Sequence, residues 1–221
     1  MKLDLILKFL RDLAKHNDRE WFEKNKSRYL EAKQGFEDLV AACLKEFVKF
    51  DDSLGALDPR KLPFRIYRDV RFSKDKSPYK TNMGAGFSPN GKLVQEPGYY
   101  LHIQPGNQSF VAGGIYMPDA ANLSKIRQEI DYNGDKLIKI LKGKTFKSLY
   151  DGLDDFDKLK TMPKGYEKTH PHIDLLKHKS YIVSRALTDK QVIDKNFLKV
   201  VAQSAKAIKP LNDFIKEAIT D

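Results

Sequence analysis

The sequence predicts an α+β protein in which N-terminal and C-terminal helices pack a central, largely antiparallel sheet of about four to six strands. Apolar residues recur at helical spacing in the first fifty residues and again after residue 118. Between these regions lie short alternating segments separated by Pro-Asn-Gly, Pro-Gly and Pro-Gly-Asn turns. Short turns join adjacent antiparallel strands, whereas parallel strands need long crossovers, so the middle region favours an antiparallel meander.

Residues 1–50 are expected to be helical. Apolar residues between Leu3 and Leu13 recur every three or four positions, which predicts a first helix. Asn17 followed by Glu20 predicts a capping box that opens a long amphipathic helix ending near Phe50. Cys43 lies on the apolar stripe of this helix, so its thiol is expected to be buried and inert. A loop is expected over residues 51–63.

Residues 64–117 are expected to be rich in strands. The alternation of apolar and polar residues predicts a strand at Phe64–Phe72. Turn residues separate three more short candidates, at Thr81–Ser88, Tyr99–Pro105 and Phe110–Met117.

Residues 118–221 are expected to be mainly helical. Helical spacing predicts segments at Ala120–Ile130, Asp135–Leu141 and Phe146–Tyr150, and a further strand is expected at Tyr181–Leu187. Thr188 with Gln191 predicts a second capping box, which opens a helix that reaches Ile208. Pro210 is expected to kink or restart that helix. No linker is apparent, so the sequence predicts a single domain over residues 1–221.

The composition excludes several classes of protein. A chain of 221 residues with 41% apolar residues can bury a core without disulfides or metals. Its one cysteine, Cys43, excludes an intrachain disulfide and a cysteine-rich zinc site. No apolar run is long enough for a transmembrane helix, and residues 1–10 lack the features of a secretory signal. We therefore expect a cytoplasmic protein with no metal, no cofactor and no membrane association.

Positive charge is concentrated in one segment. Residues 60–80 contain eight Lys and Arg residues against two Asp residues, which accounts for +6 of the net charge of +10. If Phe64–Phe72 is a strand, Phe64, Ile66, Val70 and Phe72 share one face and are expected in the core. Arg68 then lies on the apolar side, where it needs an acidic partner, a bulge that turns it outward, or a cavity.

The opposite face of this predicted strand carries Arg65, Tyr67, Asp69 and Arg71. Such a row can form Arg–Asp forks, and it can equally bind a phosphate or carboxylate with two hydrogen bonds. The polar loop at residues 73–81 follows, with Pro78 restricting its backbone. Small residues at 84–86 and 112–114 allow close approach of a ligand or another backbone. Internal pairing or protection of a sheet edge is the alternative explanation for the charge.

Several short motifs resemble a known family. The central one runs from Arg65 to Thr81 (RIYRDVRFSKDKSPYKT). Others occur in the same order along nearly the whole chain, at residues 17–22 (NDREWF), 97–101 (PGYYL), 113–118 (GGIYMP), 163–166 (PKGY), 170–171 (HP) and 175–177 (LLK). The chain thereby resembles the bacterial and fungal family of uncharacterised proteins labelled domain of unknown function 2461. The resemblance implies one domain and an intracellular setting, and it names no catalytic residue.

Other motifs point to ordinary structural roles. His170, His172 and His178 lack the helical spacing of a zinc site, so they are expected to be loop or capping residues. His102 lies mid-strand on the face opposite Leu101 and is expected to be exposed, with an acid–base role as the alternative. The acidic residues at 151–157 lack the order of a calcium loop.

We therefore expect an anion-binding site for a phosphate- or carboxylate-bearing small molecule on the basic segment. The candidate ligand-binding residues are Arg65, Tyr67, Arg68, Asp69, Arg71, Lys74, Lys76, Tyr79 and Lys80. If the protein is an enzyme, phosphoryl or acyl transfer or hydrolysis is the natural reaction, because Arg and Lys stabilise developing negative charge. The sequence leaves two alternatives open, a non-enzymatic interaction module and a nucleic-acid-binding protein. It names no catalytic residue and no oligomeric state.

Overall fold

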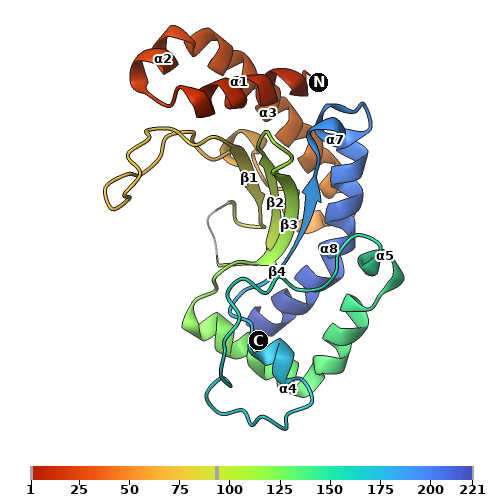
Figure 1. The fold of residues 1–221 in the computed structure, drawn as a ribbon. Helices are drawn as coiled ribbons and strands as arrows, with labels where there is room; N and C mark the ends of the chain where they lie inside the picture. The colour runs from red at the N-terminus through yellow and green to blue at the C-terminus, as the bar shows by residue number, and fades with distance from the viewer. Residues whose placement is uncertain (1, 93–94, 221) are drawn as a thin grey trace.

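The centre of the molecule is a four-stranded antiparallel sheet in the order β1-β2-β3-β4 (Figure 1). The computed structural model describes residues 2–92 and 95–220. The strands are β1 (Met83–Phe87), β2 (Gly98–Ile103), β3 (Ser109–Ile115) and β4 (Tyr181–Leu187). The predicted α+β class and antiparallel meander are confirmed, and β4 has the bounds expected from the sequence.

Helices precede the sheet, and others lie between β3 and β4 and after β4. They are α1 (Leu3–Lys15), α2 (Arg19–Lys24), α3 (Lys26–Phe47), α4 (Ala120–Leu141), α5 (Lys144–Lys147), α6 (Ile173–Leu176), α7 (Asp189–Ile193) and α8 (Phe197–Thr220). Short 3₁₀ turns occur at Asp52–Leu54 and Pro59–Lys61. In the described part of the chain, no helix combines the length and the apolar composition that crossing a bilayer requires.

The expected long helix from Asn17 to Phe50 is divided into α2 and α3. Asp18, not Asn17, is the N-cap of α2, because its carboxylate accepts a hydrogen bond of 2.8 Å from the backbone of Trp21. The Asn17 side chain instead forms two hydrogen bonds with the backbone of Tyr79. The capping box predicted at Asn17 is therefore wrong by one residue, because a long-range contact competes for its side chain.

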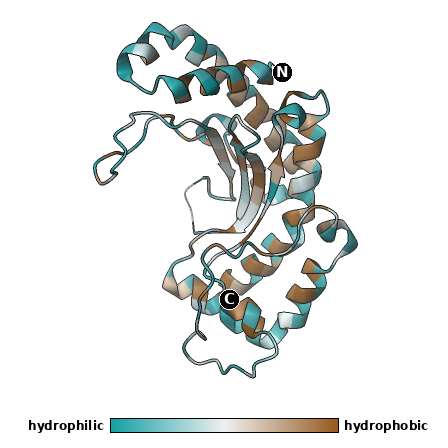
Figure 2. Ribbon diagram, viewed as in Figure 1, coloured by the Kyte–Doolittle hydropathy of each residue, from teal (hydrophilic) through white to brown (hydrophobic). Residues whose placement is uncertain are grey.

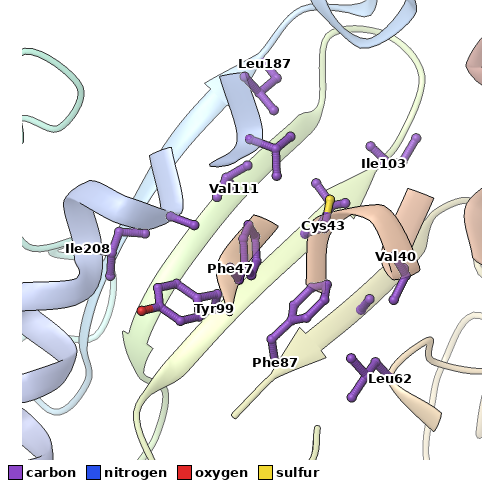
Figure 3. Packing of buried hydrophobic residues seen from close by; sticks show 14 of the residues in the cluster. Val40, Cys43, Phe47, Leu62, Phe87, Tyr99, Ile103, Val111, Leu187 and Ile208 are labelled. Carbon is purple, nitrogen blue, oxygen red and sulfur yellow. The ribbon is translucent and has the colours of Figure 1, made fainter. Parts of the chain in front are cut away.

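One face of the sheet is covered by α3 and α8. Figure 3 shows Phe47 of α3 and Ile208 of α8 against residues of all four strands. Phe87, Tyr99 and Val111 point into this layer, and each is at most 3% exposed. Burial of such apolar side chains supplies the main driving force for the fold. Cys43 lies in the same layer with no exposed surface, as expected, and burial raises the pKa of its thiol.

The C-terminal helices differ from the prediction in two places. The two helices expected at 120–130 and 135–141 form the single helix α4, which is interrupted only by the non-helical backbone of Asn133. The capping box of Thr188 and Gln191 is confirmed, but the helix it opens, α7, ends at Ile193. The next helix, α8, continues through Pro210, so the expected restart there is wrong. Buried residues on both sides of Pro210 outweigh the one hydrogen bond that proline removes.

The predicted strand at Phe64–Phe72 is absent. Phe64 donates a backbone hydrogen bond of 2.8 Å to Gly84 in β1, but the following residues pair with residues 78–80 of the same segment. The chain between them forms a loop that projects from the molecule (Figure 1), and Figure 2 shows this loop as mainly hydrophilic. Phe72, expected in the core, is 98% exposed. Ile66, also expected in the core, is 4% exposed, whereas Phe64 and Val70 are half-buried. Alternation does not show whether a neighbouring strand is available to cover every residue on one face.

The second face of the sheet is not covered by α3 or α8. It carries the alternate residues of each strand, including Tyr100, His102, Phe110, Ser184 and Ala186. These side chains are half-buried or exposed, whereas their neighbours along the strands are buried, except for the half-buried Arg185. We call this surface the open face, and it carries the candidate site.

Candidate anion-binding site

A pocket of about 240 Å³ lies where the basic segment meets the open face. Its lining residues come from the basic segment, from β1 and the residue before it, and from β2: Phe64, Arg65, Lys80, Asn82, Gly84 and Tyr100. Two residues of the basic segment, Arg65 and Lys80, are therefore brought together on this pocket although fifteen positions separate them in the sequence. The backbone hydrogen bonds that join residues 66–68 to residues 78–80 produce this approach.

Gly84 makes room for the side chain of Tyr100. A Cβ atom at position 84 would lie 2.3 Å from the Tyr100 hydroxyl oxygen, which is closer than any real contact. The glycine therefore lets the phenol of β2 lie across β1 and reach the pocket. The ring of Phe64 stands edge-on to Tyr100, with 6.2 Å between the ring centroids.

Arg65 and Lys80 line this pocket, and a third cation, Lys92, lies beside it against the Phe64 ring. The ammonium groups of Lys80 and Lys92 lie 5.7 Å and 5.4 Å from the centroid of the Phe64 ring, and Lys92 also donates to the carbonyl of Pro63. Within residues 2–92 and 95–220, no carboxylate oxygen lies within 4.0 Å of the charged nitrogens of Arg65, Lys80 or Lys92. The pocket is therefore electropositive.

The pKa values of the two lysines reflect this environment. Burial lowers the pKa of Lys80, and the nearby charges of Arg65 and Lys92 lower it further. Burial also lowers the pKa of Lys92. Both shifts mean that the folded protein disfavours the charged lysines, a cost that a bound anion would offset.

A hydrogen-bonded network joins the pocket to the open face. His102 Nε2 lies 2.7 Å from Gln104 Oε1, which assigns the proton to Nε2 and leaves Nδ1 as an acceptor. Nδ1 lies 3.2 Å from the Tyr100 hydroxyl and 3.4 Å from Asn82 Nδ2. Because Nδ1 has one lone pair, one of these two donors is free to bind a ligand at any time.

Burial holds both titratable members of the network in their neutral forms. It raises the pKa of Tyr100 to about 12, so the phenol stays protonated and remains a hydrogen-bond donor. It lowers the pKa of His102, against the smaller opposing effect of the hydrogen bond to Gln104. His102 was expected to be exposed, but it is half-buried because Tyr100, Phe110 and Gln104 surround it.

The remaining candidates in the projecting loop are engaged within the loop itself. Arg68 donates to Asp75 at 2.5 Å and to the carbonyl of Ser77 at 3.0 Å, so it has the acidic partner that its position required. Arg71 forms a fork with Asp69 through bonds of 2.9 Å and 2.6 Å. Two of the predicted cations are thus neutralised by local carboxylates rather than free for a ligand.

Hydrogen bonds and ion pairs within the loop also lower the pKa values of its two carboxylates. Hydrogen bonds from the side chain and backbone of Ser77, followed by that from Arg68, lower the pKa of Asp75 to about 2. The Arg71 side chain is the main cause that lowers the pKa of Asp69. Lys76 donates to the carbonyl of Val70, and Lys74 is exposed. Most of these charged side chains therefore bond to other groups of the same loop, and few hydrogen-bonding groups remain free for a ligand.

The two tyrosines of the basic segment anchor it to the N-terminal helices. Tyr79 is 4% exposed and stacks on Phe22 of α2, with 4.0 Å between the ring centroids. Tyr67 packs against Tyr79, at 5.4 Å, and is 48% exposed. The structure therefore places both tyrosines against α2 and neither of them among the residues that line the pocket.

Sequence reasoning missed Asn82, Lys92 and Tyr100. A signal for Tyr100 was present, because Tyr100 and His102 alternate with the apolar Leu101 and Ile103 in a predicted strand. Lys92 lies beyond the basic segment, and its ammonium group comes beside the pocket residue Phe64 only because the chain turns back after β1.

Three of the other histidines, His170, His172 and His178, lie beside acidic residues. His170 lies 2.8 Å from Asp131, and the buried His178 lies 3.5 Å from Asp155. Across the described residues, no three His, Cys, Asp or Glu side chains converge as metal ligands.

Comparison with known proteins places the chain in a family. No curated protein and no solved structure matches this chain. A family model described as "Conserved hypothetical protein (DUF2461)" matches residues 5–214, which include the pocket, the open face and the projecting loop. The chain belongs to the DUF2461 family.

Proposed function

We propose that this protein binds a small phosphate- or carboxylate-bearing molecule in the pocket formed by Arg65, Lys80, Asn82 and Tyr100. The observation that carries the proposal is that Arg65 and Lys80 line the pocket, with Lys92 beside it, and that none of the three has an acidic partner among the described residues. The other arginines of the segment, Arg60, Arg68 and Arg71, each have an acidic partner.

The donors at the pocket suit a tetrahedral or planar oxyanion. A guanidinium can donate two parallel hydrogen bonds, an ammonium supplies a compact charge, and the phenol and amide add neutral donors. Bringing the anion between Arg65 and Lys80 would replace repulsion between like charges with attraction. The neutral, protonated Tyr100 adds a donor without adding charge.

The same groups suit catalysis at the bound anion. Arg65 and Lys80 are residue types that stabilise negative charge as it develops on a phosphoryl or acyl oxygen. If the bound molecule reacts, transfer or hydrolysis of a phosphoryl or acyl group is the reaction class that this pocket would support.

Isothermal titration calorimetry of the full chain tests the proposal. Inorganic phosphate, pyrophosphate and citrate are titrated into wild type, Lys80→Ala and Lys74→Ala. We expect at least one anion to bind wild type and its Kd to rise about ten-fold or more in Lys80→Ala, because a charge-assisted hydrogen bond is lost. Lys74→Ala removes the same charge from the projecting loop and should leave the Kd within about two-fold of wild type, since only a screened surface charge is lost.

Two results would contradict the proposal. One is the absence of binding to folded wild-type protein by all three anions at millimolar concentration. The other is an equal loss of affinity in Lys80→Ala and Lys74→Ala, because that would assign binding to overall charge rather than to the pocket.

A further inference from the structure

Two aromatic rings stack at the centre of the open face. His102 of β2 and Phe110 of β3 are direct cross-strand partners in the antiparallel register. Their ring centroids are 4.5 Å apart and their planes are inclined by 15°. Both side chains are half-buried, so part of each ring remains accessible to solvent. We call these two residues the aromatic pair.

Small residues flank the aromatic pair. Gly84 is the register partner of His102 on β1, and Ala186 is the partner of Phe110 on β4. In the adjacent row of the open face, Ala112 pairs with Ser184. Ala186 and Ser184 are exposed. The face of the Phe110 ring that is turned away from His102 is therefore not covered by a large cross-strand neighbour, and a flat group can stack there.

Tyr100 connects the aromatic pair to the anion pocket. Its ring centroid lies 5.9 Å from that of His102 and 5.7 Å from that of Phe110, and the same side chain lines the pocket. Adjacent strands are about 4.8 Å apart, so about 10 Å separates β1, beside the pocket, from β3. This is the length scale of one nucleotide from its phosphate to its base.

Amide side chains lie beside the aromatic pair. Gln104 accepts from His102 and donates to Gln108 at the turn between β2 and β3. Asn82 lies on the other side of His102, next to the pocket. Amide groups offer both donors and acceptors, which match the hydrogen-bonding edges of nucleobases.

From this arrangement we infer that the ligand of the pocket is a nucleotide unit, with a phosphate group held by Arg65 and Lys80 and a base stacked on Phe110. The inference rests on the proposed function and specifies the class of anion. Half-exposed aromatic side chains on an antiparallel sheet, combined with cations along one edge, are typical of surfaces that bind nucleotides through stacking and phosphate contacts. The nucleotide can be free or part of a single strand, and the ligands tested separate these two sources.

Calorimetric titrations of the full chain with four ligands test this inference. The ligands are inorganic phosphate, ribose 5-phosphate, AMP and a short single-stranded oligoadenylate. Stacking of one base on an aromatic side chain strengthens binding by about ten-fold or more. We therefore expect AMP to bind wild type at least about ten-fold more tightly than ribose 5-phosphate. Tighter binding of oligoadenylate than of AMP, with affinity that falls steeply as salt rises, would identify a single strand as the source. AMP binding as tight as oligoadenylate binding would identify the free nucleotide.

Phe110→Leu supplies the matched variant. It should weaken AMP about ten-fold and leave ribose 5-phosphate unchanged, because only the stacking surface is lost. Tyr116→Leu, at an exposed aromatic residue immediately after β3, should leave both affinities unchanged. The comparison of AMP with ribose 5-phosphate in wild type does not depend on how well either variant folds.

The outcomes separate this inference from the proposed function. Equal affinities of wild type for AMP, ribose 5-phosphate and phosphate would overturn the nucleotide inference and leave anion binding supported. Failure of all four ligands to bind would overturn the nucleotide inference, and it would overturn the proposed function as well if pyrophosphate and citrate also fail to bind. A ten-fold preference for AMP that persists unchanged in a folded Phe110→Leu variant would overturn the placement of the base.

Discussion

The side-chain amide of Asn17 binds both backbone groups of Tyr79. Its nitrogen donates to the Tyr79 carbonyl at 2.9 Å, and its oxygen accepts from the Tyr79 amide at 3.1 Å. This pair of bonds joins the start of the second N-terminal helix to a residue 62 positions away. Because Lys80 follows Tyr79 directly, Asn17 helps to fix the position of a cation of the pocket.

Replacing Asn17 with alanine should therefore affect both stability and binding. Asn17→Ala removes two partly buried hydrogen bonds and leaves the Tyr79 backbone without these partners, so it should lower the free energy of unfolding by about 1–3 kcal/mol. Urea unfolding measures this change. Lys15→Ala, at an exposed residue near the end of α1, should change it by less than about 0.5 kcal/mol. Equal stability of Asn17→Ala and wild type would refute the anchoring role.

Gly84→Ala should move the Tyr100 hydroxyl away from the pocket. The new Cβ would meet that oxygen at 2.3 Å, and the phenol, as the end of a side chain, can shift. We expect a stability loss of about 1 kcal/mol and a several-fold rise in the Kd for phosphate, measured by calorimetry. Gly35→Ala in α3, where the nearest atom would be 3.8 Å from the new Cβ, should leave the Kd unchanged. A folded Gly84→Ala protein that binds phosphate as wild type does would exclude Tyr100 from the site.

The low pKa of Asp75 predicts a pH-dependent contribution to stability. The carboxyl titrates at about 2 in the folded protein against 3.8 as its ordinary value. Its contribution is therefore present above pH ~4 and is lost as the pH falls through about 2. The difference in free energy of unfolding between wild type and Asp75→Asn should shrink over this range in urea titrations.

Ser77→Ala should reduce this pH effect, because it removes the hydroxyl hydrogen bond that is the first cause of the lowered pKa, and it leaves the backbone hydrogen bond in place. A difference between wild type and Asp75→Asn that stays constant with pH would show that the carboxylate is not held by these partners.

The lowered pKa of Lys80 predicts that anion binding weakens with rising pH. Loss of the Lys80 proton removes one charge from the pocket, and this loss occurs below the ordinary lysine pKa of 10.5. Sulfate affinity should therefore fall as the pH rises from about 8 to about 10, measured by calorimetry. Tyr100, with a pKa of about 12, stays protonated in this range. Lys80→Arg keeps its charge and should show a smaller decrease. The same decrease in both proteins would assign the effect to other groups.

Local sequence patterns predicted the parts of the fold that local contacts determine. The capping box of Thr188 and Gln191 forms within one helical turn, and Tyr181–Leu187 is a short run that contains Tyr, Ile and Val, residues enriched in strands. The pattern failed at Phe64–Phe72, because alternation cannot show whether a strand has a neighbour to pair with. It also failed at Asn17, whose side chain is hydrogen-bonded to the backbone of Tyr79, 62 positions away.

The site was predicted only in part for a similar reason. Charge counting identified the basic segment and included Arg65 and Lys80. It could not separate them from Arg68 and Arg71, whose carboxylate partners depend on the folding of the projecting loop. The contribution of Tyr100 depends on the register of β1 against β2, which no local pattern specifies.

The most direct test of the pocket is a crystal structure of the protein soaked with tungstate, a heavy-atom analogue of phosphate and sulfate. Anomalous scattering then locates the anion without reference to any assumed site. We predict a tungstate ion within hydrogen-bonding distance of Arg65, Lys80 and the Tyr100 hydroxyl. Tungstate bound only at the projecting loop, with the pocket open to solvent and empty, would contradict the account.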